Sequence, residues 1–166
     1  MRLLFKAAIV IFLVMLCVFP SQAQFFVMEN PLVGKPAKDF TLKTLSGKEI
    51  NLSKFRDGNN AIVFFWATWC PHCREQLKQL SQEKATIEKK GIKVILVDVE
   101  EPERQVRAHV DKNKIPFDVF LDEKTSVAED YEIIGVPTFF FINKEGTVKA
   151  VEHYLPKDYD AIFTND

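Results

Sequence analysis

Trp69-Cys70-Pro71-His72-Cys73 is the stretch that decides the fold of this chain. It follows a continuous apolar run at residues 61–66, and residues 75–90 beyond it contain neither proline nor glycine. The apolar run predicts a strand covered on both faces, and the residues after the cysteines carry apolar side chains at helical spacing. The two thiols are therefore expected where a strand ends and a helix begins, with Pro71 in the first helical turn, where proline costs no hydrogen bond.

The two cysteines are spaced for reversible disulfide exchange. Cys70 would face the unpaired N–H groups and the positive end of the helix dipole, and both favour the thiolate, which is the attacking species. Cys73 lies one turn further on and is expected to be more buried and to resolve the mixed disulfide. His72 adds a donor or a charge near the Cys70 sulfur, which would make the disulfide form a stronger oxidant.

Two other uses of a Cys-x-x-Cys pair fit this sequence less well. A structural zinc site usually has four ligands, but the chain has no second such pair, and its 3 histidines are not at ligand spacing from one another. A permanent disulfide across so short a loop adds little stability. We therefore expect neither a bound metal nor another cofactor, and we interpret the pair as redox machinery.

The first residues of the chain predict export. A basic start is followed by an apolar run, and Ser21-Gln22-Ala23 places small residues at the positions that define cleavage. Residues 1–23 therefore read as a secretory signal peptide, with an uncleaved membrane anchor over residues 3–19 as the alternative. Residues 24–166 would form a single periplasmic or otherwise extracytoplasmic domain, associated with a membrane only if the signal segment is retained.

Composition narrows the partners. The 166 residues include 22 Lys and Arg against 23 Asp and Glu. The chain therefore lacks the excess of basic residues that would favour a nucleic-acid partner. Of the 3 cysteines, Cys17 would leave with the signal segment. One remaining pair at minimal spacing cannot join distant parts of a secreted fold, so it indicates a redox function rather than a disulfide scaffold.

The order of predicted elements indicates an α/β fold with a mixed central sheet. Strands at residues 61–66 and 92–97 flank the helix after the cysteines and predict a parallel βαβ unit with a right-handed crossover. A hairpin around Gly47 is expected before this unit. The remaining predicted elements are a helix at 101–113, a strand at 117–121, a short helix at 126–131, an antiparallel hairpin at 138–142 and 147–153, and a short terminal helix within 156–166.

Pro137 is a second informative residue. Val136-Pro137 precedes an apolar strand, where a proline is normally unfavourable. A trans proline at the first strand residue explains this position, and so does a cis proline placed beside the cysteines, because cis peptide bonds are mostly a proline feature.

Residues 65–73 together with Gly135-Val136-Pro137-Thr138 resemble the thioredoxin fold. Residues 34–40 and 52–55 are similar to the branch that contains TlpA and ResA, the membrane-associated or periplasmic thiol–disulfide oxidoreductases of the AhpC/TSA–redoxin superfamily. The resemblance covers roughly residues 31–155. It implies a thioredoxin-like fold, a mixed sheet flanked by helices with an N-terminal β-hairpin extension.

The resemblance also implies roles for individual residues. Cys70 would be the nucleophile, Cys73 the resolving thiol, and Pro137 a cis proline. The backbone of Val136 would pair with an extended client chain, and Trp69 would pack beside the active site. The implied partners are client proteins with thiols or disulfides and a membrane-bound redox donor or acceptor. The implied function is disulfide exchange in the cell envelope, either reducing clients, as in cytochrome c maturation, or oxidising them.

The sequence departs from the family at the groups that move protons. Many members have a glutamate three residues after the second cysteine, where this chain has Gln76, with Glu75 one residue earlier. Phe64 stands where ordinary thioredoxins have a buried aspartate, and the Pro-His dipeptide resembles that of the oxidant DsbA. Glu75 and Asp98 are candidate proton acceptors, but a solvated charge is the simpler interpretation of each, as it is for Glu101.

Two further functions are compatible with parts of the sequence. A peroxiredoxin shares the lead-in segment, but its Pro-x-x-x-Thr-x-x-Cys pattern is absent, because Ala67 stands at the threonine position. A binding module could use a groove at Val136-Pro137 to hold peptides without any redox step.

Overall fold

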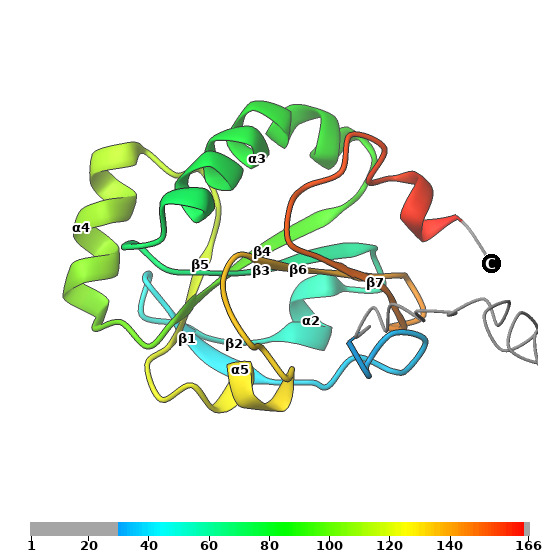
Figure 1. The fold of residues 1–166 in the computed structure, drawn as a ribbon, viewed down its shortest axis with the longest axis horizontal. Helices are drawn as coiled ribbons and strands as arrows, with labels where there is room; N and C mark the ends of the chain where they lie inside the picture. The colour runs from blue at the N-terminus through cyan, green and yellow to red at the C-terminus, as the bar shows by residue number, and fades with distance from the viewer. Residues whose placement is uncertain (1–29, 165–166) are drawn as a thin grey trace, which may run out of the picture.

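The computed structural model describes residues 30–164, so the predicted signal segment lies outside the described residues. Within this range, seven strands form one mixed sheet in the order β2-β1-β5-β4-β3-β6-β7 (Figure 1). The strands are β1 (Thr41–Thr44), β2 (Glu49–Asn51), β3 (Ala61–Trp66), β4 (Lys93–Val99), β5 (Val119–Asp122), β6 (Thr138–Ile142) and β7 (Val148–Glu152). The predicted N-terminal hairpin is confirmed as β1 and β2, which are antiparallel.

The centre of the sheet is the strand that leads to the cysteines. All residues of β3 are buried, and β3 pairs in parallel with β4 and antiparallel with β6. The predicted parallel βαβ unit and the antiparallel hairpin of β6 and β7 are thereby confirmed. The helices are α2 (Leu52–Arg56), α3 (Pro71–Lys89), α4 (Glu103–Asn113) and α5 (Ser126–Asp130), with a 3-10 turn η1 (Ala161–Phe163).

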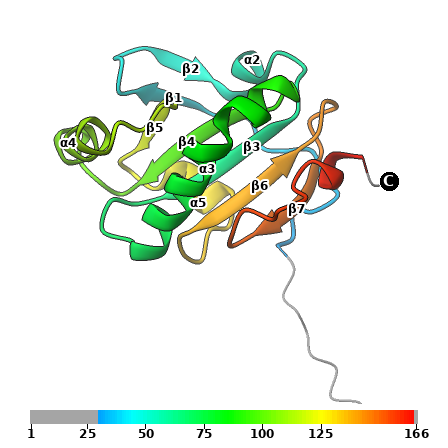
Figure 2. The same ribbon diagram turned by 90° about the horizontal axis from the view of Figure 1, so that it is seen from above.

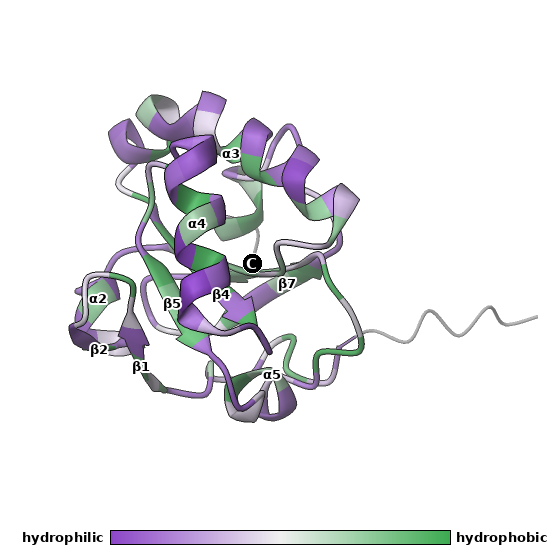
Figure 3. Ribbon diagram, turned by 90° about the vertical axis from the view of Figure 1, so that its left-hand side faces the viewer, coloured by the Kyte–Doolittle hydropathy of each residue, from purple (hydrophilic) through white to green (hydrophobic). Residues whose placement is uncertain are grey.

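Helices cover both faces of the sheet, as predicted. Figure 1 shows α3 and α4 on one face and α2 and α5 on the other, and Figure 2 shows α3 passing over the central strands. In Figure 3, α3 and α4 carry both hydrophilic and hydrophobic residues, as expected of helices with one face on a sheet. These layers enclose two hydrophobic cores, one on each face.

The alternation of side chains along β3 explains both cores. Phe64 and Trp66 belong to the core under α3, while Val63 and Phe65 belong to the core on the opposite face. Phe64 stacks on Phe139 of β6 with ring centroids 4.1 Å apart. Phe64, at the position where ordinary thioredoxins carry a buried aspartate, is thus part of an aromatic core.

The short terminal helix predicted within residues 156–166 is present among the described residues as the 3-10 helix η1 (Ala161–Phe163). One expectation is corrected by the fold. Asp98 and Glu101 are buried, at 0% and 4% exposure, and are not solvated charges. Separately, none of the helices within residues 30–164 combines the length and apolar character needed to cross a bilayer.

Candidate active site

The two cysteines lie at the N-terminus of α3, as predicted. Cys70 is the N-cap residue in extended conformation, its sulfur accepts a hydrogen bond from the Cys73 N–H at 3.1 Å, and Pro71 occupies the first turn. Cys70 and Cys73 form a disulfide, with their Cα atoms 5.2 Å apart. Pro71 costs this helix end no hydrogen bond, because the N–H groups of the first turn have no partner within the helix. The Cys73 N–H is the amide that serves the Cys70 sulfur.

The two sulfurs differ in what can reach them. Cys70 retains 3% exposure and Cys73 none, which is the order expected of an attacking and a resolving thiol. Beside them, the indole of Trp69 is 66% exposed. Of the two sulfurs, that of Cys70 is therefore the one with access to solvent, next to the exposed Trp69.

Val136 and Pro137 lie directly beside the disulfide. The Val136-Pro137 peptide bond is cis, as the resemblance implied, and the Val136 carbonyl oxygen lies 3.7 Å from the Cys70 sulfur. The Thr138 hydroxyl donates to the Gly135 carbonyl at 2.7 Å, and Nδ1 of His153 lies 2.9 Å from the Pro137 carbonyl oxygen. This contact of His153 was not predicted, because it depends on the pairing of β6 with β7.

A groove of about 1030 Å³ extends along the cis proline. Its walls include residues 132–138, His72, Gln76 and residues 151–153. Within this wall, Ile134 is 93% exposed, which is unusual for a large apolar side chain. The groove therefore offers both backbone groups and apolar surface to a client.

The polar residues around the helix start have different partners from those predicted. His72 and Glu75 are 80% and 75% exposed, and His72 Nδ1 lies 3.7 Å from the Glu75 carboxylate. Among the described residues, neither side chain hydrogen-bonds to a cysteine sulfur. The Gln76 side chain accepts the Leu155 N–H at 2.7 Å and so anchors the C-terminal segment.

Asp98 and Glu101 are two buried acids near the loop before Cys70. The sequence predicted both of them to be solvated. The Glu101 carboxylate accepts the Thr68 N–H at 2.5 Å and the Thr68 hydroxyl at 2.6 Å. Asp98 lies at the end of β4, where burial, followed by the contact with Glu101, raises its pKa to about 9. The Glu75 carboxylate lies in solvent, so of the two proton-acceptor candidates only Asp98 is buried.

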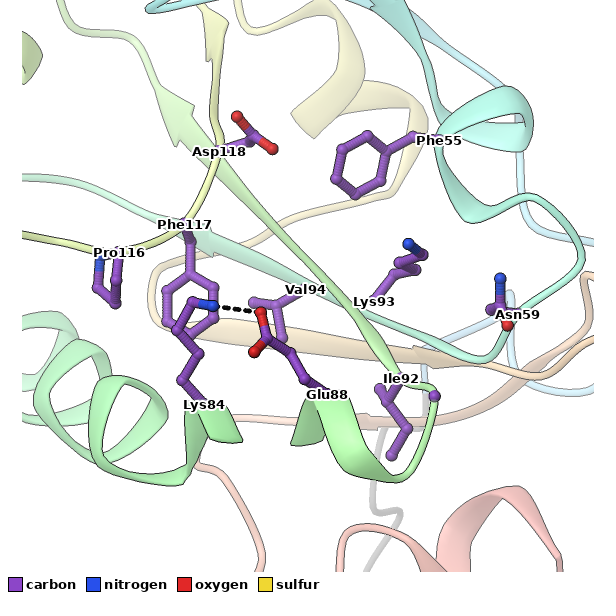
Figure 4. A pocket seen from close by; sticks show the side chains of 11 residues that line it. Phe55, Asn59, Lys84, Glu88, Ile92, Lys93, Val94, Pro116, Phe117 and Asp118 are labelled. Atoms are coloured by element: carbon purple, nitrogen blue, oxygen red, sulfur yellow. Dashed lines mark hydrogen bonds and ion pairs between the residues drawn. The ribbon is translucent and has the colours of Figure 1, made fainter. Parts of the chain in front are cut away.

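A second cavity, of about 430 Å³, lies where β4 begins and just ahead of β5 (Figure 4). Lys84 forms an ion pair with Glu88 at its edge and lies 6.0 Å from the centre of the Phe117 ring. Cys70 follows the opposite end of the parallel strands, so this cavity is remote from the disulfide.

A disulfide at a helix N-terminus, beside a cis proline on a mixed sheet, defines a thioredoxin-fold thiol–disulfide oxidoreductase. The model of the AhpC/TSA family matches residues 33–151, and the chain belongs to this family. A relative from Bacillus thuringiensis subsp. konkukian, thiol-disulfide oxidoreductase ResA, is 30% identical over 167 residues, which span 94% of this chain and 96% of the relative. The chain is accordingly a ResA-like thiol–disulfide oxidoreductase.

Solved structures agree with this assignment. A putative thiol:disulfide interchange protein DsbE from Chlorobium tepidum superposes with a TM-score of 0.70 at 28% identity, covering 78% of this chain and 92% of that protein. StoA from Bacillus subtilis superposes with a TM-score of 0.65 at 25% identity, covering 81% of this chain and all of StoA.

Proposed function

We propose that this protein works in the cell envelope, where it reduces disulfides of client proteins with electrons from a membrane-bound donor. The observation that carries the proposal is the Cys70–Cys73 disulfide beside the open groove at Pro137. The export signal expected in residues 1–23 supports the location. The relative named ResA and the neighbour titled DsbE support an exchange reaction with proteins.

The exchange would proceed in two steps. The Cys70 thiolate, stabilised by the Cys73 N–H and the helix dipole, attacks one sulfur of a client disulfide and releases the other as a thiolate. Cys73 then gives its proton to the client thiolate released in the first step and attacks the Cys70 sulfur, which releases the second client thiolate. The client gains two electrons, and the protein ends as the Cys70–Cys73 disulfide.

The client would bind in extended form along the groove. The Val136 backbone next to the Cys70 sulfur would pair with the client main chain, while Ile134 and Trp69 supply exposed apolar contacts. Main-chain pairing accepts many sequences, so this arrangement suits a protein that serves more than one client.

The reduction potential of the Cys70–Cys73 pair tests the direction of electron flow. Equilibration with glutathione and with thioredoxin-type buffers should give a value near or below that of thioredoxin, about −270 mV. A value near that of DsbA, about −120 mV, would overturn the reducing direction and assign oxidation of clients instead.

Single variants test the exchange reaction itself. Cys70→Ala should abolish reduction of a model disulfide protein. Retained exchange would contradict the assignment of Cys70.

Two further measurements test the alternative functions. Peroxide consumption without a dithiol partner would favour the peroxidase interpretation, and client binding that survives in a Cys70→Ala/Cys73→Ala variant would favour a binding module. The location is tested by sequencing the mature N-terminus, which should begin at Gln24.

A further inference from the structure

Glu101 connects the loop before Cys70 to the start of α4. Its carboxylate, 4% exposed, accepts two hydrogen bonds from Thr68 and one from the Gln105 side-chain amide. Gln105 also donates to the Thr68 hydroxyl at 3.0 Å. Thr68 precedes Cys70 by two residues, so Glu101 fixes the backbone from which the active-site helix starts. Hydrogen bonds to an ionised group are the stronger kind, which suits a buried anchor.

Asp98 completes this anchor. Its side chain is fully buried on the face of β4 that packs under α3 and α4, and it lies opposite Trp66 in the parallel register. Among the described residues, no N–H or O–H group donates to either carboxylate oxygen. An ionised Asp98 would therefore be a buried charge without a partner, which is costly. A protonated Asp98 can instead donate its proton to the neighbouring Glu101 carboxylate.

The charges around Asp98 also favour its protonated form. Asp122 and Glu123, at the end of β5, act on Asp98 in the same direction as Glu101 and raise its pKa. From α4, the ring of His109 contacts Trp66 with centroids 5.6 Å apart, and burial, followed by Arg74, lowers the pKa of His109.

Arg74 of α3 donates to the Thr68 carbonyl at 3.3 Å, so its guanidinium is paired with the backbone of this loop. At neutral pH, Asp98 therefore keeps its proton.

We propose that Glu101 is a positioning residue for disulfide exchange and that Asp98 is its proton-donating partner. While the pair holds one proton, Glu101 keeps Thr68, and with it Cys70, in the geometry described above. When Asp98 loses its proton, two buried negative charges repel each other. Glu101 then leaves Thr68, and the loop before Cys70 loses its anchor.

The pH profile of exchange tests this proposal. Asp98→Asn keeps an N–H donor for Glu101 but cannot release it, so this variant serves as the reference. The rate of reduction of the Cys70–Cys73 disulfide by dithiothreitol is measured for both proteins from about pH 7 to about pH 10. The reagent's own ionisation cancels in the ratio of the two rates.

The ratio of wild type to Asp98→Asn, divided by its own value at about pH 7, should fall about tenfold by about pH 10, where roughly one tenth of the wild-type molecules keep the proton on Asp98. A ratio that stays constant across this range would overturn the proposal.

A second pair of variants keeps the test decisive if Asp98→Asn folds poorly. Glu101→Gln has one acceptor oxygen where the carboxylate has two, so it cannot accept from both the Thr68 N–H and the Gln105 amide. Exchange should therefore be slower at every pH and should lose the alkaline decline. Glu100→Gln changes the adjacent, exposed carboxylate and should match the wild type. Equal rates and equal pH profiles for Glu101→Gln and Glu100→Gln, with unchanged circular dichroism, would refute the positioning role of Glu101.

Discussion

Replacing Asp98 by asparagine is expected to change how the stability of the fold depends on pH. Burial and the contact with Glu101 raise the pKa of Asp98 to about 9 in the folded protein, whereas an aspartate in an unfolded chain has a pKa of about 3.9. Between these values, the folded protein holds a proton that the unfolded chain has released. The contribution of Asp98 to stability is therefore most favourable below about pH 4 and declines as the pH rises toward the folded-state pKa.

The size of this effect follows from linkage. When the folded state holds one proton more than the unfolded chain, each unit by which the pH rises lowers the free energy of unfolding by about 1.4 kcal/mol. Between about pH 5.5 and about pH 7.5, Asp98 should therefore cost the wild type roughly 3 kcal/mol. Asp98→Asn escapes this loss because an amide does not titrate, while every other titrating group is common to both proteins.

Urea unfolding of the disulfide-bonded proteins, followed by circular dichroism at several pH values, measures this difference. The free energy of unfolding should fall more steeply with pH in the wild type than in Asp98→Asn, by the slope given above. Asp118→Asn, which changes an exposed aspartate, is the matched control and should follow the wild type. Parallel pH dependences of the wild type and Asp98→Asn would show that Asp98 is ionised when folded and would refute the reasoning.

Other side chains give further predictions. Phe64→Ala should destabilise the fold by about 3–5 kcal/mol in urea unfolding, because it removes a fully buried ring stacked on Phe139. Cys73→Ala should accumulate a mixed disulfide with the client, detected by mass spectrometry, since the resolving thiol is missing; prompt client release would contradict its role. Tyr131→Phe should cost about 1 kcal/mol by the same unfolding assay, because the buried hydroxyl donates to the Lys38 carbonyl at 2.5 Å. No change in that free energy would show that water replaces this bond.

Elements that depend on local patterns were predicted closely. The apolar run at residues 61–66 coincides with β3, because a strand buried on both faces needs no polar alternation. Pro71 marks the first turn of α3 for a reason that is also local, the missing N–H. The position of Cys70 at the helix N-terminus follows from these two elements, because the strand leads directly into the helix.

Features that depend on contacts between distant residues were not predicted. Asp98 and Glu101 stand where a strand ends and a helix starts, and charged residues in such places are usually solvated. The burial of Glu101 requires Thr68, 33 residues earlier in the chain, to supply hydrogen-bond donors. The burial of Asp98 depends on the packing of β4 in the core under α3. The short terminal helix was predicted, but the hydrogen bond between Gln76 and Leu155 that holds the chain just before it to α3 was not.

The charges around Cys70 bear on the direction of electron flow. The Pro-His dipeptide alone suggests a stable thiolate and hence an oxidising disulfide. His72, however, is 80% exposed and lies 3.7 Å from Glu75, so solvent and a neighbouring carboxylate both weaken its effect on the sulfur. Glu101 is a buried acid bonded to the loop that carries Cys70, so it brings no positive charge to stabilise a thiolate there. A less stable thiolate means a less oxidising disulfide, so these features favour the proposed reduction of client disulfides over their formation.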